Sequence, residues 1–404
     1  MRRGMRAGVC CATVAALAIT VAWLAAFDAA GAEAASAASV RSRIDGLARD
    51  AVAHHGLKAV IVQATVKGRP VITRAYGESM TGVPATTRMH FRNGAVAISY
   101  ISTLLLRLVD EGKVKLDDKV SKWLPKLRDG DRVTLRMLAA MTAGYHDYEL
   151  DPRLNTQLYS NPFGVVTTKR QLSLALGEPQ QFTPGTNWSY AHSDYVILGL
   201  ALEKITGQPL AVALRKRVLR PLGLRNTVAA QTAAIPKPVL HAYSGERRPF
   251  LGIPPSTPFL EDSTFWNPSW TLPRGAVETT DIADMTRTAI GIGSGRLLTR
   301  RSHREQIDPH LGFGRPQAGC ERCTTLNRLY GYGLGAVRNG AWILQNPLFG
   351  GYAAIESYLP SKRISIALAT TFDENSFTSQ GDYTTYWTTL YAKIGAVLAP
   401  TSRH

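Results

Sequence analysis

The sequence predicts an α+β fold in which strands from both ends of the chain form one antiparallel sheet. Segments typical of strands occur early, at 57–77, and late, at 330–371, whereas the region from about 95 to 289 has mostly helical periodicity. A chain of 404 residues, 45% of them hydrophobic, can bury a large core. The economical arrangement covers one face of the sheet with the terminal helices and places a helical lobe beside it, with a binding cleft between them.

The N-terminal residues have the layout of a secretory signal peptide. A basic stretch at 1–6 precedes an uncharged apolar stretch at 7–27, and small residues with cleavage sites ending at Ala32 or Ala34 follow. We therefore interpret residues 1–34 as a signal peptide and the protein as exported and extracytoplasmic. An uncleaved membrane anchor is the alternative, because about 20 apolar residues can also span a bilayer.

The remaining elements are expected in a simple order. Residues 38–56 have the pattern of a helix, 57–66 that of a strand, and the turn at 67–70 lets 71–77 pair back as a hairpin. The stretch 101–109 is almost continuously apolar, which indicates a buried helix. The late strands are expected at 330–337, 341–345, 352–359 and 364–371, and a closing helix at 382–398. Together they predict one domain over 40–398, with a sheet lobe at about 40–92 and 328–398 and a helical lobe at about 93–327.

The cysteines are too few for a disulfide-dense scaffold. Cys10 and Cys11 lie in the apolar leader, and Cys320 and Cys323 form a C-x-x-C motif. In an exported protein this motif most simply closes a small disulfide loop. A redox centre would need a thioredoxin-like strand and helix, and a zinc site would need two further ligands, and the sequence offers neither. We expect no metal and no cofactor.

Several blocks of sequence resemble one known family. They lie, in order, at 91–125, 133–145, 182–192, 198–207, 221–224, 278–285 and 351–360. Over about residues 40–395 the chain resembles the serine β-lactamase-related family, which groups class C β-lactamases, D-alanyl-D-alanine peptidases and related esterases. The resemblance implies a β-lactamase/DD-peptidase-like fold and serine hydrolase chemistry.

The catalytic S-x-x-K motif of that family is missing from this chain. In the family, the serine hydroxyl attacks a carbonyl, and the lysine one helical turn further on takes the serine proton. The register of the 91–125 block puts Ala95 at the serine and Ile98 at the lysine, and no S-x-x-K occurs elsewhere. A methyl group cannot form an acyl-enzyme. Ser99 and Ser102 are the nearest replacement nucleophiles, but neither has a basic partner within helical reach.

The resemblance assigns three further residues to the cleft. The Y-x-N or Y-x-H motif is represented by Tyr190 and His192, and the H-x-G or K-T-G motif falls at Gln345, with Asn346 and Pro347 as its next two positions. In relatives the tyrosine assists proton transfer, whereas without a nucleophile it could serve only to pack the cleft wall. His192 could titrate near neutral pH or be a hydrogen-bonded structural residue. Pro347 would block a bulky substrate from adding along that strand.

Basic charge is the remaining feature of the sequence that could indicate a function. The formal net charge is +17, and the dense runs are Arg215 to Arg225, Arg247 with Arg248, and Arg296 to Arg304. Such runs are typical of a solvated surface, and alternatively they could attract the protein to an anionic envelope surface. A nucleic-acid partner is not expected for an exported chain that has no recognition motif.

The sequence therefore favours an exported, catalytically inactive or impaired member of the family that binds a cell-wall ligand, a small ester or peptide, or a partner. One alternative is an active hydrolase, of the esterase or D-alanyl peptidase type, with a different nucleophile. A second is a basic wall- or membrane-associated structural protein whose cleft is idle. An open pocket lined by Tyr190 and His192 would count against the second alternative.

Overall fold

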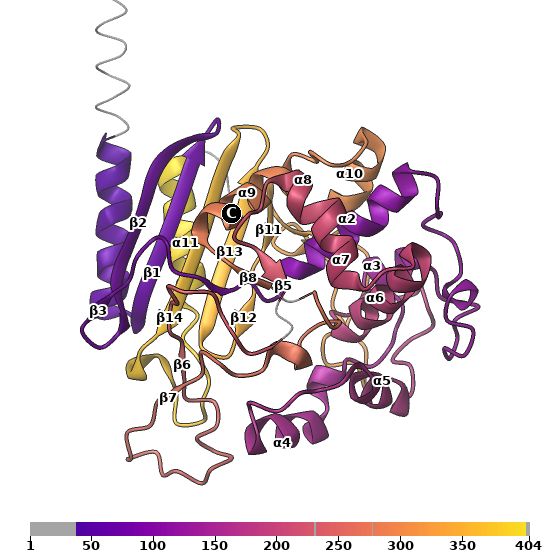
Figure 1. The fold of residues 1–404 in the computed structure, drawn as a ribbon, viewed down its shortest axis with the longest axis horizontal. Helices are drawn as coiled ribbons and strands as arrows, with labels where there is room; N and C mark the ends of the chain where they lie inside the picture. The colour runs from indigo at the N-terminus through magenta and orange to yellow at the C-terminus, as the bar shows by residue number, and fades with distance from the viewer. Residues whose placement is uncertain (1–37, 230–231, 277, 401–404) are drawn as a thin grey trace, which may run out of the picture.

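The computed structural model describes residues 38–229, 232–276 and 278–400, which form a large sheet with helices on its faces and a helical lobe to one side (Figure 1). The predicted α+β class is confirmed. The proposed signal peptide at 1–34, including Cys10 and Cys11, lies outside the described residues.

The main sheet joins the two ends of the chain. Its strands run in the order β3-β2-β1-β14-β13-β11-β10-β9, with β12 beside β13, and all neighbours are antiparallel. They are β1 (Leu57–Val66), β2 (Arg69–Met80), β3 (Val83–Pro84), β9 (Gly331–Tyr332), β10 (Val337–Asn339), β11 (Trp342–Gln345), β12 (Leu348–Phe349), β13 (Tyr352–Leu359) and β14 (Ile364–Phe372). The central pair, β1 and β14, is nearly all buried, which explains why both read as continuous apolar segments.

The late part of the sheet differs from the sequence prediction at one place. A single strand over 330–337 is wrong, because the chain there forms two short strands, β9 and β10, that pair with each other as a hairpin. The turn between them contains Gly335 at φ +73, where a side chain would collide with the Ser102 hydroxyl, 2.5 Å from an added Cβ. The apolar pattern predicted extended chain, but the close approach to the helical lobe requires a turn.

Helices cover both faces of the sheet. Ile343 of β11 pairs with Tyr358 of β13, so the two share a face, and Trp342 points to the other one. Gly293 of α9 (Ile282–Gly293) lies so close to Tyr358 that an added Cβ would be 2.4 Å from the tyrosine Cβ. On the opposite face, Tyr391 of α11 (Tyr386–Leu398) contacts Trp342 edge to face.

The two terminal helices share that second face. Residues 38–54 are helical, and the ring of His55, just beyond this helix, stacks on Tyr386 of α11 with 3.6 Å between ring centroids. The middle of this helix is also tied to β2, because Asp45 accepts hydrogen bonds from Arg74 at 2.9 Å and from Tyr76. The expected pairing of terminal helices on one face of the sheet is present.

The helical lobe surrounds α2 (Val96–Asp110), which is buried along most of its length. The other helices of the lobe are α3 (Leu135–Ala139), α4 (Pro152–Ser160), α5 (Thr168–Gly177), α6 (His192–Thr206), α7 (Leu210–Leu214), α8 (Arg220–Leu222) and α10 (Arg300–Ile307). A π-helical turn, η3 (Arg215–Leu219), joins α7 to α8, and 3₁₀ turns lie at η1 (Val120–Lys122), η2 (Tyr148–Leu150), η4 (Pro268–Trp270) and η5 (Glu374–Ser376). Two small sheets, β4 (Phe91–Arg92) with β8 (Glu278–Thr280) and β5 (Val228–Ala229), and β6 (Tyr243–Ser244) with β7 (Glu261–Asp262), complete the fold.

No single helix within the described residues has the length and apolar character of a membrane span, although the bent pair α6 and Leu210–Leu222, at 73° to each other, meets both criteria when taken together.

Cys320 and Cys323 form a disulfide in the segment that leads from the helical lobe to the late strands. Both cysteines are buried and pack against Phe182. Backbone bridges join Cys323 to Ser189 and Cys320 to Gln317. The disulfide thus closes a four-residue loop and holds it against the segment that precedes α6.

Replacing both cysteines with serine should lower the free energy of unfolding by about 1–3 kcal/mol, because the bridge closes only a short loop in the unfolded chain. Urea unfolding of the unreduced protein measures the difference. Mass spectrometry of the unreduced peptide that contains Cys320 and Cys323 provides the control, and two alkylated thiols in that peptide would refute the disulfide.

Candidate functional site

A cleft of about 290 Å³ opens at the start of α2. Gly94 and Ala95 line it, and Ala95 is the N-cap of the helix. Opposite them lies Pro347, and a Cβ added to Gly94, which has φ +46, would lie 2.7 Å from the proline Cβ. The position that the resemblance assigns to the nucleophile therefore does face a cleft, but it carries only a methyl group.

The position assigned to the lysine lies in the core. Ile98 is fully buried one turn into α2 and belongs to the main hydrophobic cluster. Ser99, the nearest serine, is also fully buried, and its hydroxyl donates to the Val96 carbonyl at 2.7 Å. Ser102 is buried as well and donates to the Ser99 carbonyl at 3.0 Å. Neither serine hydroxyl is presented to the cleft.

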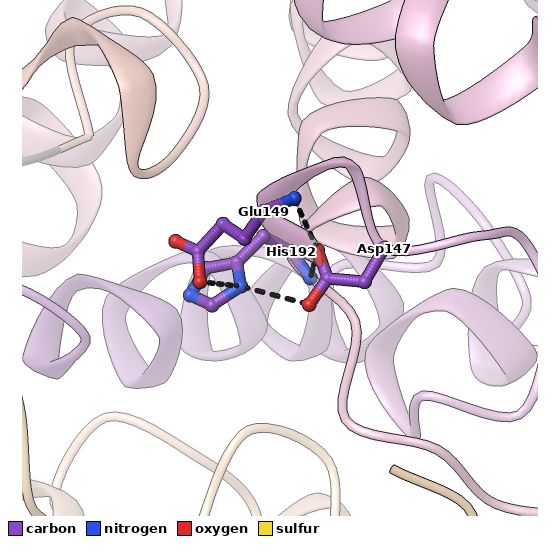
Figure 2. A group of neighbouring side chains, drawn as sticks. All are labelled: Asp147, Glu149 and His192. Carbon is purple, nitrogen blue, oxygen red and sulfur yellow. Dashed lines mark hydrogen bonds and ion pairs between the residues drawn. The ribbon is translucent and has the colours of Figure 1, made fainter. Parts of the chain in front are cut away.

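A cluster of charged side chains lies at one wall of the cleft, where His192 and Glu149 line the cavity and Asp147 is buried beside them. His192 begins α6, whereas Asp147 and Glu149 come from the loop and 3₁₀ turn before α4. The Nδ1 atom of His192 lies 2.9 Å from Glu149 Oε2 and 3.3 Å from Asp147 Oδ2 (Figure 2). Asp147 also accepts the His192 backbone N–H at 3.2 Å and thereby ties the start of α6 to this loop.

Arg322 completes the cluster from the disulfide loop. Its guanidinium forms an ion pair with Asp147 and lies 3.8 Å from Glu149. It also lies 6.0 Å from the ring centroid of Tyr190, within the range of a cation–π contact. The four-residue disulfide loop thus positions a cation in the cleft.

The charges determine which protonation states the cluster adopts. Burial on its own would lower the pKa of His192, but the carboxylates of Glu149 and Asp147 outweigh it and raise that pKa to about 9. Burial opposes ionisation of Asp147 too, yet His192 and Arg322 bring its pKa below the ordinary value. For Glu149 the effect of burial is the larger one and raises the pKa. At neutral pH His192 is therefore a cation and cannot act as a general base.

Asp147, Glu149 and His192 also form a set of donor atoms that lie within 4.8 Å of one another, a spacing that could hold a metal ion. His192 would first have to lose its proton, and Arg322 would have to leave Asp147. As they stand, two cations and two carboxylates compensate one another.

Tyr190 and His192 lie where the resemblance places them, since both line the cleft. Their rings meet edge to face, with 5.1 Å between centroids. Burial raises the pKa of the Tyr190 hydroxyl well above its ordinary value, so the tyrosine is a neutral phenol.

Gln345 does not line the cleft. It is buried at the end of β11, and its side-chain amide donates to the Gly335 carbonyl at 2.8 Å. The residues after it, Asn346 and Pro347, form the cleft wall instead. Of the three positions that the family spacing gives, Gln345, Asn346 and Pro347, only the last two therefore line the cleft.

Other cleft residues carried no signal in the sequence. Glu149, Arg322, Trp270 and Tyr330 all line the cleft, and Trp270 stacks on Phe349 of β12 with 5.6 Å between ring centroids. Each lies in an irregular segment or a short turn, and Glu149, Trp270 and the Arg322–Tyr330 segment are far apart along the chain. The one available hint was the position of Arg322 inside the C-x-x-C motif.

Comparison with known proteins agrees with this architecture. A family model described as Beta-lactamase matches residues 44–388. The chain therefore belongs to the Beta-lactamase family. Solved structures similar to this Beta-lactamase family chain include a D-stereospecific amidohydrolase from Streptomyces sp., with a TM-score of 0.70, 24% identity, and coverage of 90% of this chain and 99% of the other. The D-amino acid amidase from Ochrobactrum anthropi SV3 has a TM-score of 0.73 at 20% identity, covering 90% of this chain and all of the other. Both show the fold.

Curated relatives of this Beta-lactamase family chain match over shorter stretches. Esterase EstB from Burkholderia gladioli is 30% identical over 206 residues, which are 47% of this chain and 52% of the esterase. Penicillin-binding protein 4 from Amycolatopsis lactamdurans is 32% identical over 202 residues, 48% of either protein. The chain thus spans about half the length of the curated relatives that it matches.

The His192 cluster should make stability depend on pH. Because the folded pKa, about 9, exceeds the unfolded value near 6.5, the stabilisation is fully present below about pH 6.5 and is lost as the pH rises through about 9. Urea unfolding should show a decline in that window of at most about 3 kcal/mol that is missing in His192→Gln. His54→Gln, which changes a histidine in an exposed ion pair, is the control and should keep the decline. An equal decline in His192→Gln would show that another group is responsible.

Proposed function

We propose that this protein is an exported, non-hydrolysing member of the Beta-lactamase family that uses the former catalytic cleft to bind a small ester or peptide ligand of the kind found in cell walls. One observation carries the proposal: the two positions that need a serine and a lysine hold Ala95, at the cleft, and Ile98, in the core.

An active hydrolase would need another nucleophile or an activated water. Ser99 is the nearest serine, but its hydroxyl is buried and engaged within its own helix. Water activation would need a base in the cleft. His192 is protonated at neutral pH, and Glu149, the carboxylate that lines the cleft, is paired with His192 at 2.9 Å and lies 3.8 Å from Arg322. These contacts favour loss of catalysis over a change of catalytic residue.

The open cleft argues against a purely structural protein. Tyr190 and His192 line a cavity, not a packed interface, and Trp270 and Tyr330 add aromatic walls. An idle site would be expected to fill with apolar side chains, because unused cavities and buried charges both reduce stability.

The chemistry of the walls indicates the class of ligand. The cleft is small, at about 290 Å³, and combines aromatic rings with Arg322 and Glu149, which lie at 31% and 14% side-chain exposure. A guanidinium can bind a carboxylate, a carboxylate can bind an ammonium group, and the rings can cover a short apolar side chain. A short peptide or an amino-acid ester offers all three groups.

Incubation with a penicillin, a fluorophosphonate or an activated ester should produce no covalent adduct. Ala95 has only a methyl group at the nucleophile position, the hydroxyl of the cleft-lining Thr271 donates to the Pro268 carbonyl at 3.0 Å, and Tyr190 is a neutral phenol. Intact-protein mass spectrometry tests this, and a stoichiometric mass increase would contradict it. Reversible binding is tested separately. A penicillin or a D-alanyl dipeptide that binds in the cleft should reversibly change the fluorescence of Trp270, which lines it. The matched control is Trp270→Phe, which should lose the response. No response to any of these ligands would argue against the binding role.

Restoring the motif should need both residues. Ala95→Ser alone should leave ester hydrolysis at background, whereas Ala95→Ser with Ile98→Lys should permit slow acylation. The double variant should also be less stable than the wild type by about 3 kcal/mol or more, because it places an ammonium group in the apolar core. Ile98→Met, which keeps the volume, is the control and should cost less than about 1.5 kcal/mol. Clear turnover by Ala95→Ser alone would reveal a base that we have not identified.

A further inference from the structure

A second, larger concavity lies on the helical lobe, outside the cleft. It is a groove of about 840 Å³ between the continuous helix 210–222 and the segment 223–229. Twelve residues line it, including Arg215, Lys216, Arg220, Arg225, Val212 and Val228. Four of the twelve are cations, and none is acidic, so the groove carries a concentrated positive charge.

The four cations are free to meet a ligand. Arg215, Lys216, Arg220 and Arg225 are all exposed, and within the described part of the chain none of them forms an ion pair. Arg217, which follows Lys216 but does not line the groove, is by contrast paired with Glu111 at 2.6 Å. Repulsion between close like charges reduces stability, so four uncompensated cations around one groove indicate a function in binding anions.

The local backbone explains how the cations come together. Pro221 has no N–H to give to the Arg217 carbonyl, and the Arg107 guanidinium donates to that carbonyl instead. The chain makes a π turn here, in which the Arg220 N–H bonds the Arg215 carbonyl. Such wide turns inside helices occur frequently at functional sites.

The floor of the groove is apolar. Leu219 and Leu224 are buried beneath it, whereas Val212 and Val228 are 36% and 53% exposed. A purely ionic ligand would gain nothing from these aliphatic side chains, whereas a lipid places an anionic headgroup next to acyl carbons. We propose that this groove docks the protein on an anionic phospholipid surface, with the cations on the headgroups and the two valines against the upper part of an acyl chain.

The basic pair Arg247 and Arg248 does not offer the same chemistry. Arg247 is paired with Glu261 at 2.8 Å and donates to the Tyr159 carbonyl. Arg248 is buried and donates to the Pro254 and Thr257 carbonyls at 2.8 and 2.6 Å. These two arginines hold local structure together. The groove proposal is independent of the cleft and of whether the protein hydrolyses anything.

Vesicle co-sedimentation of the full chain tests the proposal. The probes are vesicles of phosphatidylcholine alone and of phosphatidylcholine mixed with phosphatidylglycerol. Arg215→Gln with Arg220→Gln should weaken binding to the anionic vesicles by about thirtyfold, since each basic residue near such a surface contributes about fivefold in affinity. Arg69→Gln with Arg88→Gln removes the same charge at exposed positions outside the groove and should have a much smaller effect. The apolar and basic N-terminal residues are common to all variants, so the comparison between variants isolates the groove.

A second arm separates lipid from soluble anions. Val228→Ser should weaken binding to anionic vesicles several-fold and leave any binding of polyphosphate or glycerol phosphate unchanged. Equal losses in the groove and control pairs would refute the proposal. Tight binding of either soluble anion that depends on Arg215 and Arg220 but not on Val228 would also overturn it, in favour of a site for a wall polymer or a free phosphate.

Discussion

The pairing of β1 with β14 is the contact on which the rest of the molecule depends. It joins residues about three hundred positions apart, from Leu57 with Phe372 to Val66 with Ile364, and nearly every side chain in both strands is buried. Closing so long a loop costs entropy that only a large apolar interface can offset. Once this pair has formed, the helical lobe is held by both ends, and the cleft lies where its first helix meets the last strands.

Three regions of the chain meet in the cleft, and no local sequence pattern in any of them predicts that they do. Ala95 begins α2, the 147–149 loop meets the start of α6, and the disulfide loop supplies Arg322. Ser193 reinforces the second junction, because its hydroxyl donates to the His146 carbonyl and accepts the Tyr148 N–H. The functional residues of this fold are therefore positioned by loops, and helix starts and the disulfide fix those loops.

Much of the fold could be predicted from the sequence, whereas less of the site could. Strands such as 57–66 and 352–359 have apolar runs bounded by turn residues, so their limits were recognisable. The prediction of a single strand over 330–337 was wrong because the apolar pattern of these residues does not show that Gly335 must lie close to Ser102. Tyr190 and His192 followed from the family resemblance, but Asp147, Glu149 and Arg322 meet only through tertiary packing. Gln345 was misplaced although the end of its strand was predicted correctly, because spacing does not show that its side chain turns to the Gly335 carbonyl and leaves the cleft to the next two residues.

The charged wall gives a physical reason to regard the cleft as a binding site. Ionic groups withdrawn from water lose solvation that their mutual attraction seldom restores, and apolar side chains of similar size are often at least as stabilising. Asp147 has 1% side-chain exposure and His192 11%, so these two groups bear most of that cost. Arg322 and Glu149 remain partly accessible and so keep donor and acceptor atoms directed at the cavity. The cluster is therefore better described as a fixed arrangement of charges that faces the cavity than as an ion pair that stabilises the fold. In the function proposed above, such an arrangement orients a polar ligand, and the methyl group at position 95 leaves that ligand intact.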